Sequence, residues 1–239
     1  MTRLLLLVAL LALAASTAGA APQRAGHDCV QGGELWFYAA DKTKLVGHRF
    51  GKGTTAVILG HQSGGDLCEW LPYARRLARL GYFVFPIDFR GHGMSGYRGP
   101  ASAHRLAADL AAATKALRKL GKKKVFFVGA SMGGLAAIVG GANTKPAVDG
   151  VVSLSAPADF MGMNGLAAAP RLRVPVLYLA AEGDDNSGFD FSKDAQAMYA
   201  RTAAADKRLE VLPGRAHGIG LLSSSVRAKT LVESFLKGH

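Results

Sequence analysis

The sequence predicts an α/β fold built around one mostly parallel sheet. Eight short runs rich in Val, Leu and Phe read as strands, and after a β-rich start they alternate with amphipathic segments of helical period. Short apolar strands between helices are typical of βαβ units, in which helices cover both faces of a sheet. The 239 residues are 49% hydrophobic and 19% charged, which suits one sizeable core. We find no internal repeat or linker after residue 20, so we expect a single domain over residues 21–239.

The first half of that domain opens with a hairpin. The runs ELWFYAA and KLVGHRF, separated by residues 41–43, have alternating apolar positions and predict an antiparallel hairpin at the sheet edge. TTAVILG then predicts a buried strand, and residues 67–80 an amphipathic helix that ends at Gly81. The run YFVFPID predicts the next strand, and residues 101–120 the next helix.

The second half repeats the strand and helix pattern. KVFFVG, GVVSLSA, VPVLYLAA and RLEVLP predict strands, and residues 132–142, 192–205 and 221–237 predict helices. Only about 17 residues, 157–173, separate GVVSLSA from VPVLYLAA, too few for a substantial lid. We therefore expect an open pocket. The run FMGMNGL within this connection either lines that pocket or packs in the interior.

The first 20 residues have the pattern of a secretory signal peptide. Arg3 gives a basic start, residues 4–15 an apolar core, and residues 18–20 a small-residue cleavage site. The apolar run is too short for a membrane span, which takes roughly 20 residues. We predict export to a periplasm or the exterior, with no membrane span after cleavage. An uncleaved N-terminal anchor is the alternative.

Export bears on the two cysteines, because an oxidising compartment lets Cys29 and Cys68 form a disulfide. Two isolated buried thiols are the alternative, and neither spacing suits a metal site.

The formal charge of +12 is dispersed apart from the run at 117–124, without interleaved aromatic residues. We therefore predict no nucleic-acid partner and interpret the charge as solvating. The oligomeric state is left open.

A serine between two glycines is the central motif. Gly129-Ala130-Ser131-Met132-Gly133 follows a predicted strand and opens a predicted helix. That context indicates a nucleophile on a strained turn, whereas the pentapeptide alone also fits a glycine-rich packing loop. We predict that Ser131 is a nucleophile.

A nucleophilic serine needs a base, and the base needs a carboxylate that orients it. VPVLYLAAEGDD ends a predicted strand in carboxylates, of which we favour Asp184, with Asp185 and Glu182 as competitors. His217 lies in a loop between the last predicted strand and helix. The order Ser131, Asp184, His217 at successive strand ends predicts a catalytic triad.

Two further loops lie at strand ends. The oxyanion of a tetrahedral intermediate takes backbone N–H donors, and we predict Met132 as the first and Ser63 as the second, with Gln62 the alternative. A purely structural glycine-rich turn is the competing interpretation of HQSGGD. In IDFRGHGMS we expect Asp88, Arg90 and His92 to fix the loop near the pocket rim, because they precede the serine.

Together, DFRGHGxS, GxSMGG and the late histidine resemble the α/β-hydrolase superfamily, specifically small serine hydrolases similar to the monoacylglycerol lipases and the serine aminopeptidase-like group. The resemblance covers about residues 34–237 and implies an α/β-hydrolase fold. Many such enzymes insert a helical cap where this chain has only residues 157–173, so we expect no substantial cap here. It implies Ser131, Asp184 and His217 as the triad and the Met132 and Ser63 amides as oxyanion donors. One departure is His61-Gln62, where such enzymes often have His-Gly.

The resemblance implies hydrolysis of carboxylic esters with small or medium acyl groups through an acyl-enzyme, with no cofactor and no metal. A peptidase or amidase with the same triad is one alternative. A non-catalytic binding protein with this fold is the other.

Overall fold

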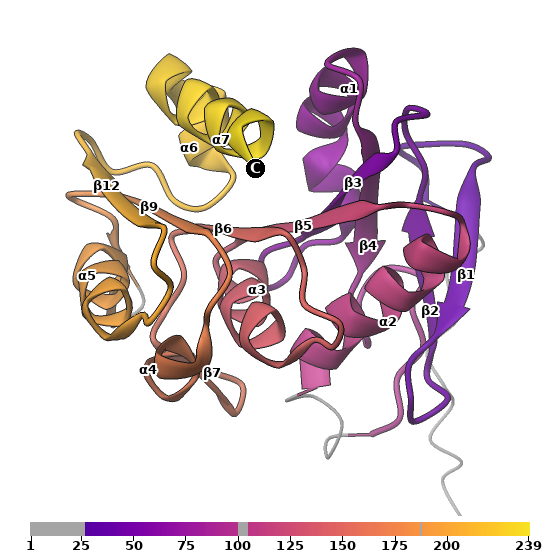
Figure 1. Cartoon of the computed structure of the whole chain (residues 1–239), viewed down its shortest axis with the longest axis horizontal. Coiled ribbons are helices and arrows are strands. Elements are labelled where there is room, and N and C mark those ends of the chain that lie inside the picture. Colours follow the sequence, from indigo (N-terminus) through magenta and orange to yellow (C-terminus); the bar gives the residue numbers. More distant parts are fainter. Residues whose placement is uncertain (1–26, 100–104, 187) are drawn as a thin grey trace, which may run out of the picture.

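A single eight-stranded sheet runs through the molecule in this computed structural model, which describes residues 27–99, 105–186 and 188–239 (Figure 1). The strand order is β1-β2-β4-β3-β5-β6-β9-β12. The first three pair antiparallel and every later neighbour pairs parallel. The strands are β1 (Glu34–Tyr38), β2 (Lys44–His48), β3 (Thr55–Gly60), β4 (Phe83–Asp88), β5 (Lys124–Ala130), β6 (Gly150–Leu154), β9 (Val176–Ala181) and β12 (Lys207–Leu212). The predicted fold class is confirmed, and the predicted signal peptide lies outside the described residues.

Helices cover both faces of the sheet (Figure 1). One face carries α2 (Leu106–Lys119), α3 (Met132–Asn143), α4 (Gly165–Ala168) and α5 (Phe191–Arg201). The other carries α1 (Leu71–Arg79), α6 (Gly220–Ser224) and α7 (Val226–Gly238). Short 3₁₀ turns, η1 (Leu67–Trp70) and η3 (Ala169–Arg171), complete the helical segments.

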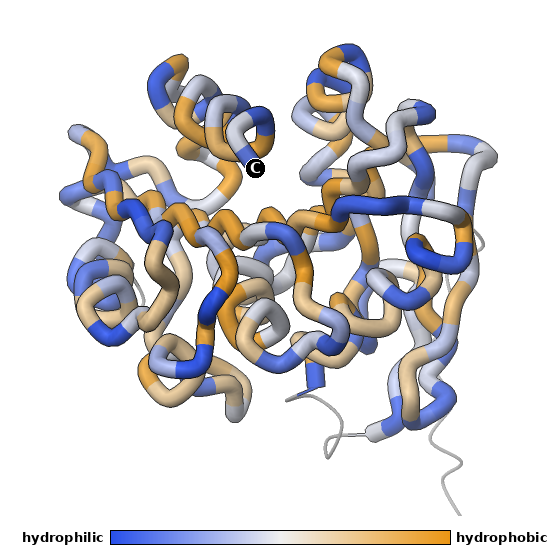
Figure 2. The backbone as a smooth tube through the Cα atoms, in the orientation of Figure 1, coloured by the Kyte–Doolittle hydropathy of each residue, from blue (hydrophilic) through white to orange (hydrophobic). Residues whose placement is uncertain are grey.

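Two hydrophobic cores follow from this layering. Successive side chains of a strand point to opposite faces, so in β3 Ala56 and Ile58 pack toward α2 and α3, whereas Val57 and Leu59 pack toward α1 and α7. All four residues are fully buried. Figure 2 shows the hydrophobic colour concentrated along the central strands and on the inner sides of the helices. This is why the inner strands read as continuous apolar runs in the sequence.

Four predicted helices differ by more than one residue at a boundary; one of them, predicted over 192–205, ends at Arg201. The predicted helix over 67–80 begins as the turn η1, where the Asp66 side chain accepts the N–H of Cys68, and becomes α-helical at Leu71. The last predicted helix is divided at Ser225, whose backbone is extended and whose hydroxyl caps α7 by accepting the N–H of Ala228 at 3.1 Å. The helix predicted from residue 101 is described from Leu106, because residues 100–104 lie outside the described part.

Two small hairpins stand where the sequence analysis predicted loops. β7 (Asp159–Phe160) pairs with β8 (Met163–Asn164) in the connection between β6 and β9. β10 (Asp185–Asn186) pairs with β11 (Phe189–Asp190) directly after β9. With α4 and η3, the first hairpin accounts for most of the β6–β9 connection, so no cap domain covers the sheet.

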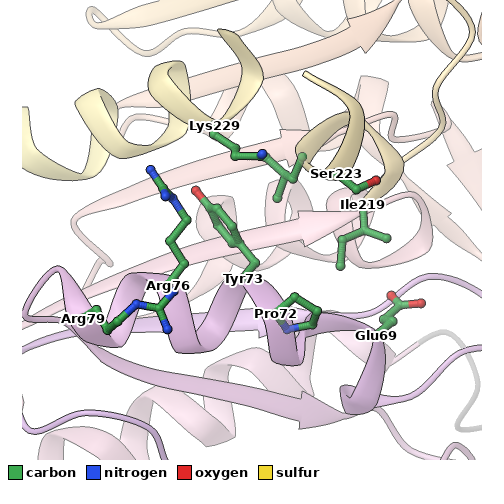
Figure 3. Close-up of a pocket in the computed structure, with 9 residues that line it drawn as sticks. Glu69, Pro72, Tyr73, Arg76, Arg79, Ile219, Ser223 and Lys229 are labelled. Atoms are coloured by element: carbon green, nitrogen blue, oxygen red, sulfur yellow. The ribbon is translucent and has the colours of Figure 1, made fainter. Parts of the chain in front are cut away.

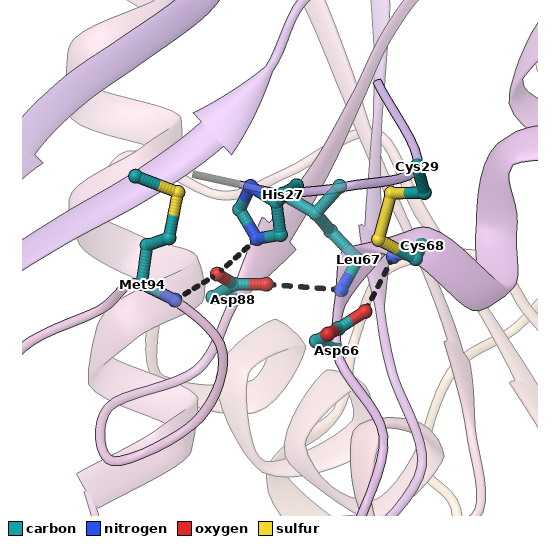
Figure 4. Close-up of a disulfide and its surroundings, with 7 residues drawn as sticks. All are labelled: His27, Cys29, Asp66, Leu67, Cys68, Asp88 and Met94. Atoms are coloured by element: carbon teal, nitrogen blue, oxygen red, sulfur yellow. Dashed lines mark hydrogen bonds and ion pairs between the residues drawn. A yellow bond between two sulfur atoms is a disulfide. The ribbon is translucent and has the colours of Figure 1, made fainter. Parts of the chain in front are cut away.

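The predicted disulfide is present and secures the start of the described chain (Figure 4). Cys29 and Cys68 are joined with a Cα–Cα distance of 5.8 Å. Beside them His27 donates from Nε2 to the buried carboxylate of Asp88 at 2.7 Å. Asp88 also accepts the N–H groups of Leu67 at 2.9 Å and Met94 at 2.7 Å. The N-terminal segment, η1 and the loop after β4 are thus fixed to one another.

None of the helices among the described residues is long and apolar enough to span a bilayer.

Candidate active site

Ser131 lies on a strained turn between β5 and α3. β5 ends at Ala130 and α3 begins at Met132, and Ser131 between them has φ 51° and ψ −117°. For a non-glycine residue this backbone conformation costs on the order of 1–3 kcal/mol of free energy, and it persists only where the surrounding structure imposes it. Here its N–H donates to the carbonyl of Leu154 at 2.7 Å, which ties the turn to the end of β6.

Two glycines permit this turn. A Cβ built at Gly129 would overlap the carbonyl oxygen of Gly133, and a Cβ at Gly133 would overlap the carbonyl oxygen of Gly60 in β3. Both obstructions are backbone atoms, which cannot rotate away as a side chain could. The glycines on either side of Ser131 therefore let β5, α3 and β3 approach at the serine.

The loop after β12 brings His217 to the carboxylate of Asp184. Nδ1 of His217 lies 2.9 Å from Oδ1 and 3.1 Å from Oδ2 of Asp184, which is only 2% exposed. An ionised carboxylate only accepts hydrogen bonds, so Nδ1 carries the proton and Nε2 is left as the basic nitrogen. The two competing carboxylates lie elsewhere, because Asp185 pairs with Arg215 at 2.6 Å and Glu182 is exposed.

Side chains from two other loops and from the start of α5 hold the histidine loop. The N–H of Gly218 donates to Oγ of Ser155 at 2.9 Å, and the N–H of Ile219 donates to Oε1 of Gln62 at 2.9 Å. On the other side, the ring centroid of Phe191 lies 4.3 Å from that of His217. The imidazole is therefore positioned by contacts beyond its bond to the carboxylate.

The loop after β3 has a defined peptide orientation. Nδ1 of the buried His61 donates to the carbonyl of Gln62 at 2.7 Å, and the N–H of Gly65 donates to the same oxygen at 3.2 Å. Because a trans peptide is planar with its C=O and N–H on opposite sides, the N–H of Ser63 points away from these donors. Among the described residues this N–H has no hydrogen-bond acceptor, whereas the N–H of Gln62 donates to Oε1 of Glu69 at 2.7 Å.

The same network keeps His61 neutral. Its Nε2 accepts the N–H of Phe89 at 3.1 Å, which requires that nitrogen to lack a proton. Burial, with a smaller contribution from the neighbouring His92, lowers the pKa of His61 to about 4 against the opposing effect of the Gln62 carbonyl. At neutral pH His61 therefore acts as a fixed hydrogen-bonding group beneath the loop.

A pocket of about 300 Å³ opens over Ser131 and His217. Gln62 and Ser63 form part of its wall, and the rest is apolar, lined by Pro157, Phe160, Phe189 and Phe191. The aromatic rings pack in sequence, with centroid distances of 6.2 Å from Phe160 to Phe189 and 5.5 Å from Phe189 to Phe191. The structure thus brings Ser131, His217 and Ser63 to one cavity, with Asp184 behind the histidine.

Sequence reasoning found only part of this wall. Phe160, in the run left as either pocket or interior, lines the pocket, whereas Met163 of the same run is buried in the core. Phe189 and Phe191 were missed. In the sequence they are marked only by their position a few residues after Asp184. That position fits residues of a pocket wall and the first residues of a helix equally well.

The loop after β4 is held from inside the protein, as expected, although its three polar residues do not line the pocket. Asp88 is fully buried, and Nδ1 of His92 lies 3.0 Å from the carbonyl of Arg90. Arg90 pairs with Asp109 of α2 and donates from Nη1 to Asp41 at 2.7 Å. Arg90 therefore joins α2, the β1–β2 turn and the β4 loop.

Among the described residues, no group of three or more His, Cys, Asp or Glu side chains is arranged to hold a metal ion.

Residues 52–166 match the family described as serine aminopeptidase, S33. Among solved structures, an esterase of Pyrococcus furiosus is 22% identical with a TM-score of 0.72, over 85% of this chain and 91% of that one. An esterase from Rhodococcus sp. is 17% identical with a TM-score of 0.70, over 86% and 98%. A monoacylglycerol lipase of Paleococcus ferrophilus is 17% identical with a TM-score of 0.66, over 82% and 99%. No curated protein matches the sequence. At these identities the structural likeness concerns the fold.

Proposed function

We propose that this chain, which has the fold of the α/β hydrolases, is an exported serine hydrolase that cleaves carboxylic esters of small or medium acyl groups. The observation that carries the proposal is the arrangement around one pocket: a serine on a strained turn and a histidine whose Nδ1 is held by a buried carboxylate. The predicted signal peptide and the Cys29–Cys68 disulfide support export.

In the proposed mechanism Nε2 of His217 takes the proton of the Ser131 hydroxyl as the serine oxygen attacks the ester carbonyl. The oxyanion accepts hydrogen bonds from two backbone N–H groups. Met132 is the first residue of α3, so its N–H has no partner within the helix. Ser63 supplies the second N–H, because the Gln62 carbonyl is held on the opposite side. His217 then protonates the leaving alcohol, and later activates the water that releases the acid and restores Ser131.

The pocket wall supports an ester with an apolar acyl group over an aminoacyl amide. An aminopeptidase binds a free ammonium group, which calls for a carboxylate or carbonyl partner near the cleaved bond. No carboxylate is among the described residues that line the pocket, the side-chain carbonyl of Gln62 already accepts the N–H of Ile219, and the apolar part of the wall is proline and phenylalanine. The volume of about 300 Å³ lies at the lower end of small-molecule sites, which supports short and medium chains.

Hydrolysis of p-nitrophenyl acetate, butyrate and octanoate by the mature protein, beside its Ser131→Ala variant, tests the proposal. We expect the wild-type protein to release p-nitrophenol and the variant to lose at least a thousandfold in kcat/KM. An alkyl fluorophosphonate should label wild-type protein at Ser131 only. Equal rates and no labelling would favour the binding-protein alternative, whereas labelling with turnover of aminoacyl p-nitroanilides alone would favour the peptidase.

A further inference from the structure

A second pocket lies on the sheet face that α1, α6 and α7 cover (Figure 3). Its volume is about 270 Å³, and none of its lining residues lines the Ser131 pocket. Side chains from α1 form one wall, and side chains from α6 and α7 form the other, as Figure 3 shows. The proposed reaction at Ser131 makes no use of this cavity.

One end of the pocket carries an excess of positive charge. Arg76, Arg79 and Lys229 line it, and Arg76 is bonded to Glu233 through Nε and through Nη2, the latter at 2.9 Å. Among the described residues, neither Arg79 nor Lys229 has a carboxylate within ion-pair distance. Two cations therefore remain without an anionic partner beside the cavity.

A buried hydroxyl lies at the same end. Tyr73 is 5% exposed, and its Oη has no hydrogen-bond partner among the described residues. Figure 3 shows its hydroxyl end and the Arg76 side chain both directed toward α7. Burial raises the pKa of Tyr73, with a smaller contribution from Glu233, so the hydroxyl stays protonated and can donate. A buried donor without an acceptor is uncommon in folded proteins, and an anion in the pocket would supply the acceptor.

An apolar stretch of the wall would orient an elongated ligand in the cavity. Pro72 and Ile219 lie between the cationic end and Glu69 (Figure 3), and Leu222 also lines the pocket. Glu69 has no cationic partner among the described residues, so its carboxylate repels an anionic ligand group at its end of the pocket, whereas the charge of Glu233 beside Tyr73 is offset by Arg76. A ligand with a negative head and an apolar tail would therefore place the head at Tyr73, Arg79 and Lys229.

We propose that this pocket, defined by Tyr73, Arg79, Lys229, Pro72 and Leu222, is a binding site for a free medium-chain carboxylate. The head accepts the Tyr73 hydroxyl and pairs with the two unpartnered cations, and the chain lies along the apolar wall. The proposal does not depend on catalysis at Ser131.

Trp70 gives a local probe for the test. Its ring centroid lies 6.3 Å from that of Tyr73, and the chain has one other tryptophan, Trp36, in β1. In a Trp36→Phe background the tryptophan fluorescence reports on Trp70 alone. We expect titration with sodium octanoate to change this emission saturably. Acetate lacks the chain and 1-octanol lacks the charge, so each should bind at least tenfold more weakly.

Variants in each pocket locate the bound octanoate. Arg79→Ala with Lys229→Ala should weaken octanoate binding at least tenfold and remove its salt dependence, and Tyr73→Phe should weaken it about tenfold. Phe189→Ala, in the Ser131 pocket, should leave it unchanged. Circular dichroism checks that each variant is folded.

Three results would overturn the proposal: no saturable response to octanoate, affinity unchanged in both the double variant and Tyr73→Phe, or affinity lost in Phe189→Ala alone. A fluorescence response to phosphatidylglycerol vesicles without one to octanoate would also overturn it, in favour of a lipid surface as the ligand.

Discussion

The protein should become less stable as the pH is lowered from 6.5 to 4, because of one buried histidine. The pKa of His61 is about 4 in the folded protein, against 6.5 for an exposed histidine. The unfolded chain therefore binds a proton between pH 6.5 and pH 4 that the folded protein does not. His61 contributes stability that is complete above pH 6.5 and is lost as the pH falls to about 4.

The difference of 2.5 pKa units corresponds to about 3 kcal/mol of unfolding free energy, of which about 2 kcal/mol is lost at pH 5. Protonation also removes the acceptor for the N–H of Phe89, which is why the folded state resists it. We expect urea unfolding to show this loss between pH 7.5 and pH 5. Nuclear magnetic resonance titration of the imidazole should place the folded pKa of His61 well below 5.5.

Other histidines titrate in the same range, so the wild-type slope alone does not isolate His61. A hydrogen bond to Asp88 raises the pKa of His27, an effect opposite in sign, whereas burial lowers the pKa of His48. A His61→Gln variant keeps both of these groups. It should be less stable at pH 7.5 yet lose about 2 kcal/mol less than the wild-type protein on going to pH 5. The same pH dependence in both proteins would refute the reasoning.

Three further predictions concern the proposed triad, the pocket and the disulfide. Asp184→Asn should lower kcat on p-nitrophenyl butyrate about ten-thousandfold and Asp185→Asn less than threefold, since only Asp184 contacts His217. A larger loss in Asp185→Asn would instead make Asp185 the carboxylate that orients the histidine. Phe189→Ala should lower kcat/KM for p-nitrophenyl octanoate about tenfold and that for the acetate ester less than threefold, because only the longer acyl chain reaches the Phe189 ring. Equal losses for both esters would contradict the assignment of this wall to the acyl chain. Replacing Cys29 and Cys68 by serine should lower the unfolding free energy by up to about 4 kcal/mol for a loop of 39 residues, measured by urea unfolding, and no loss would contradict the entropic argument.

The main sheet can be predicted from the sequence alone. Its eight strands are all predicted correctly, and the hairpin falls at the antiparallel edge, because the inner strands are buried on both faces and must be continuously apolar. The sequence also placed Ser131 correctly between a strand and a helix, since only glycines tolerate the backbone contacts at Gly129 and Gly133. The residues that meet such requirements lie close together in the chain, so they can be recognised in the sequence.

The sequence could not decide features that depend on which loops meet. Asp184 and Asp185 are adjacent and chemically identical, and they are distinguished only because the chain turns one toward His217 and the other toward Arg215. The preference for the Ser63 amide over that of Gln62 likewise rests on Glu69, which occupies the Gln62 N–H.

The pocket walls were decided by the tertiary structure as well. Phe160 and Phe189 come from separate hairpins and meet over Ser131, and the second pocket lies between α1 and a helix more than 140 residues later in the chain. A strand or a glycine turn is fixed by the period and shape of nearby residues. A cavity is the space left between segments distant in sequence, so only their packing determines its lining and its charge.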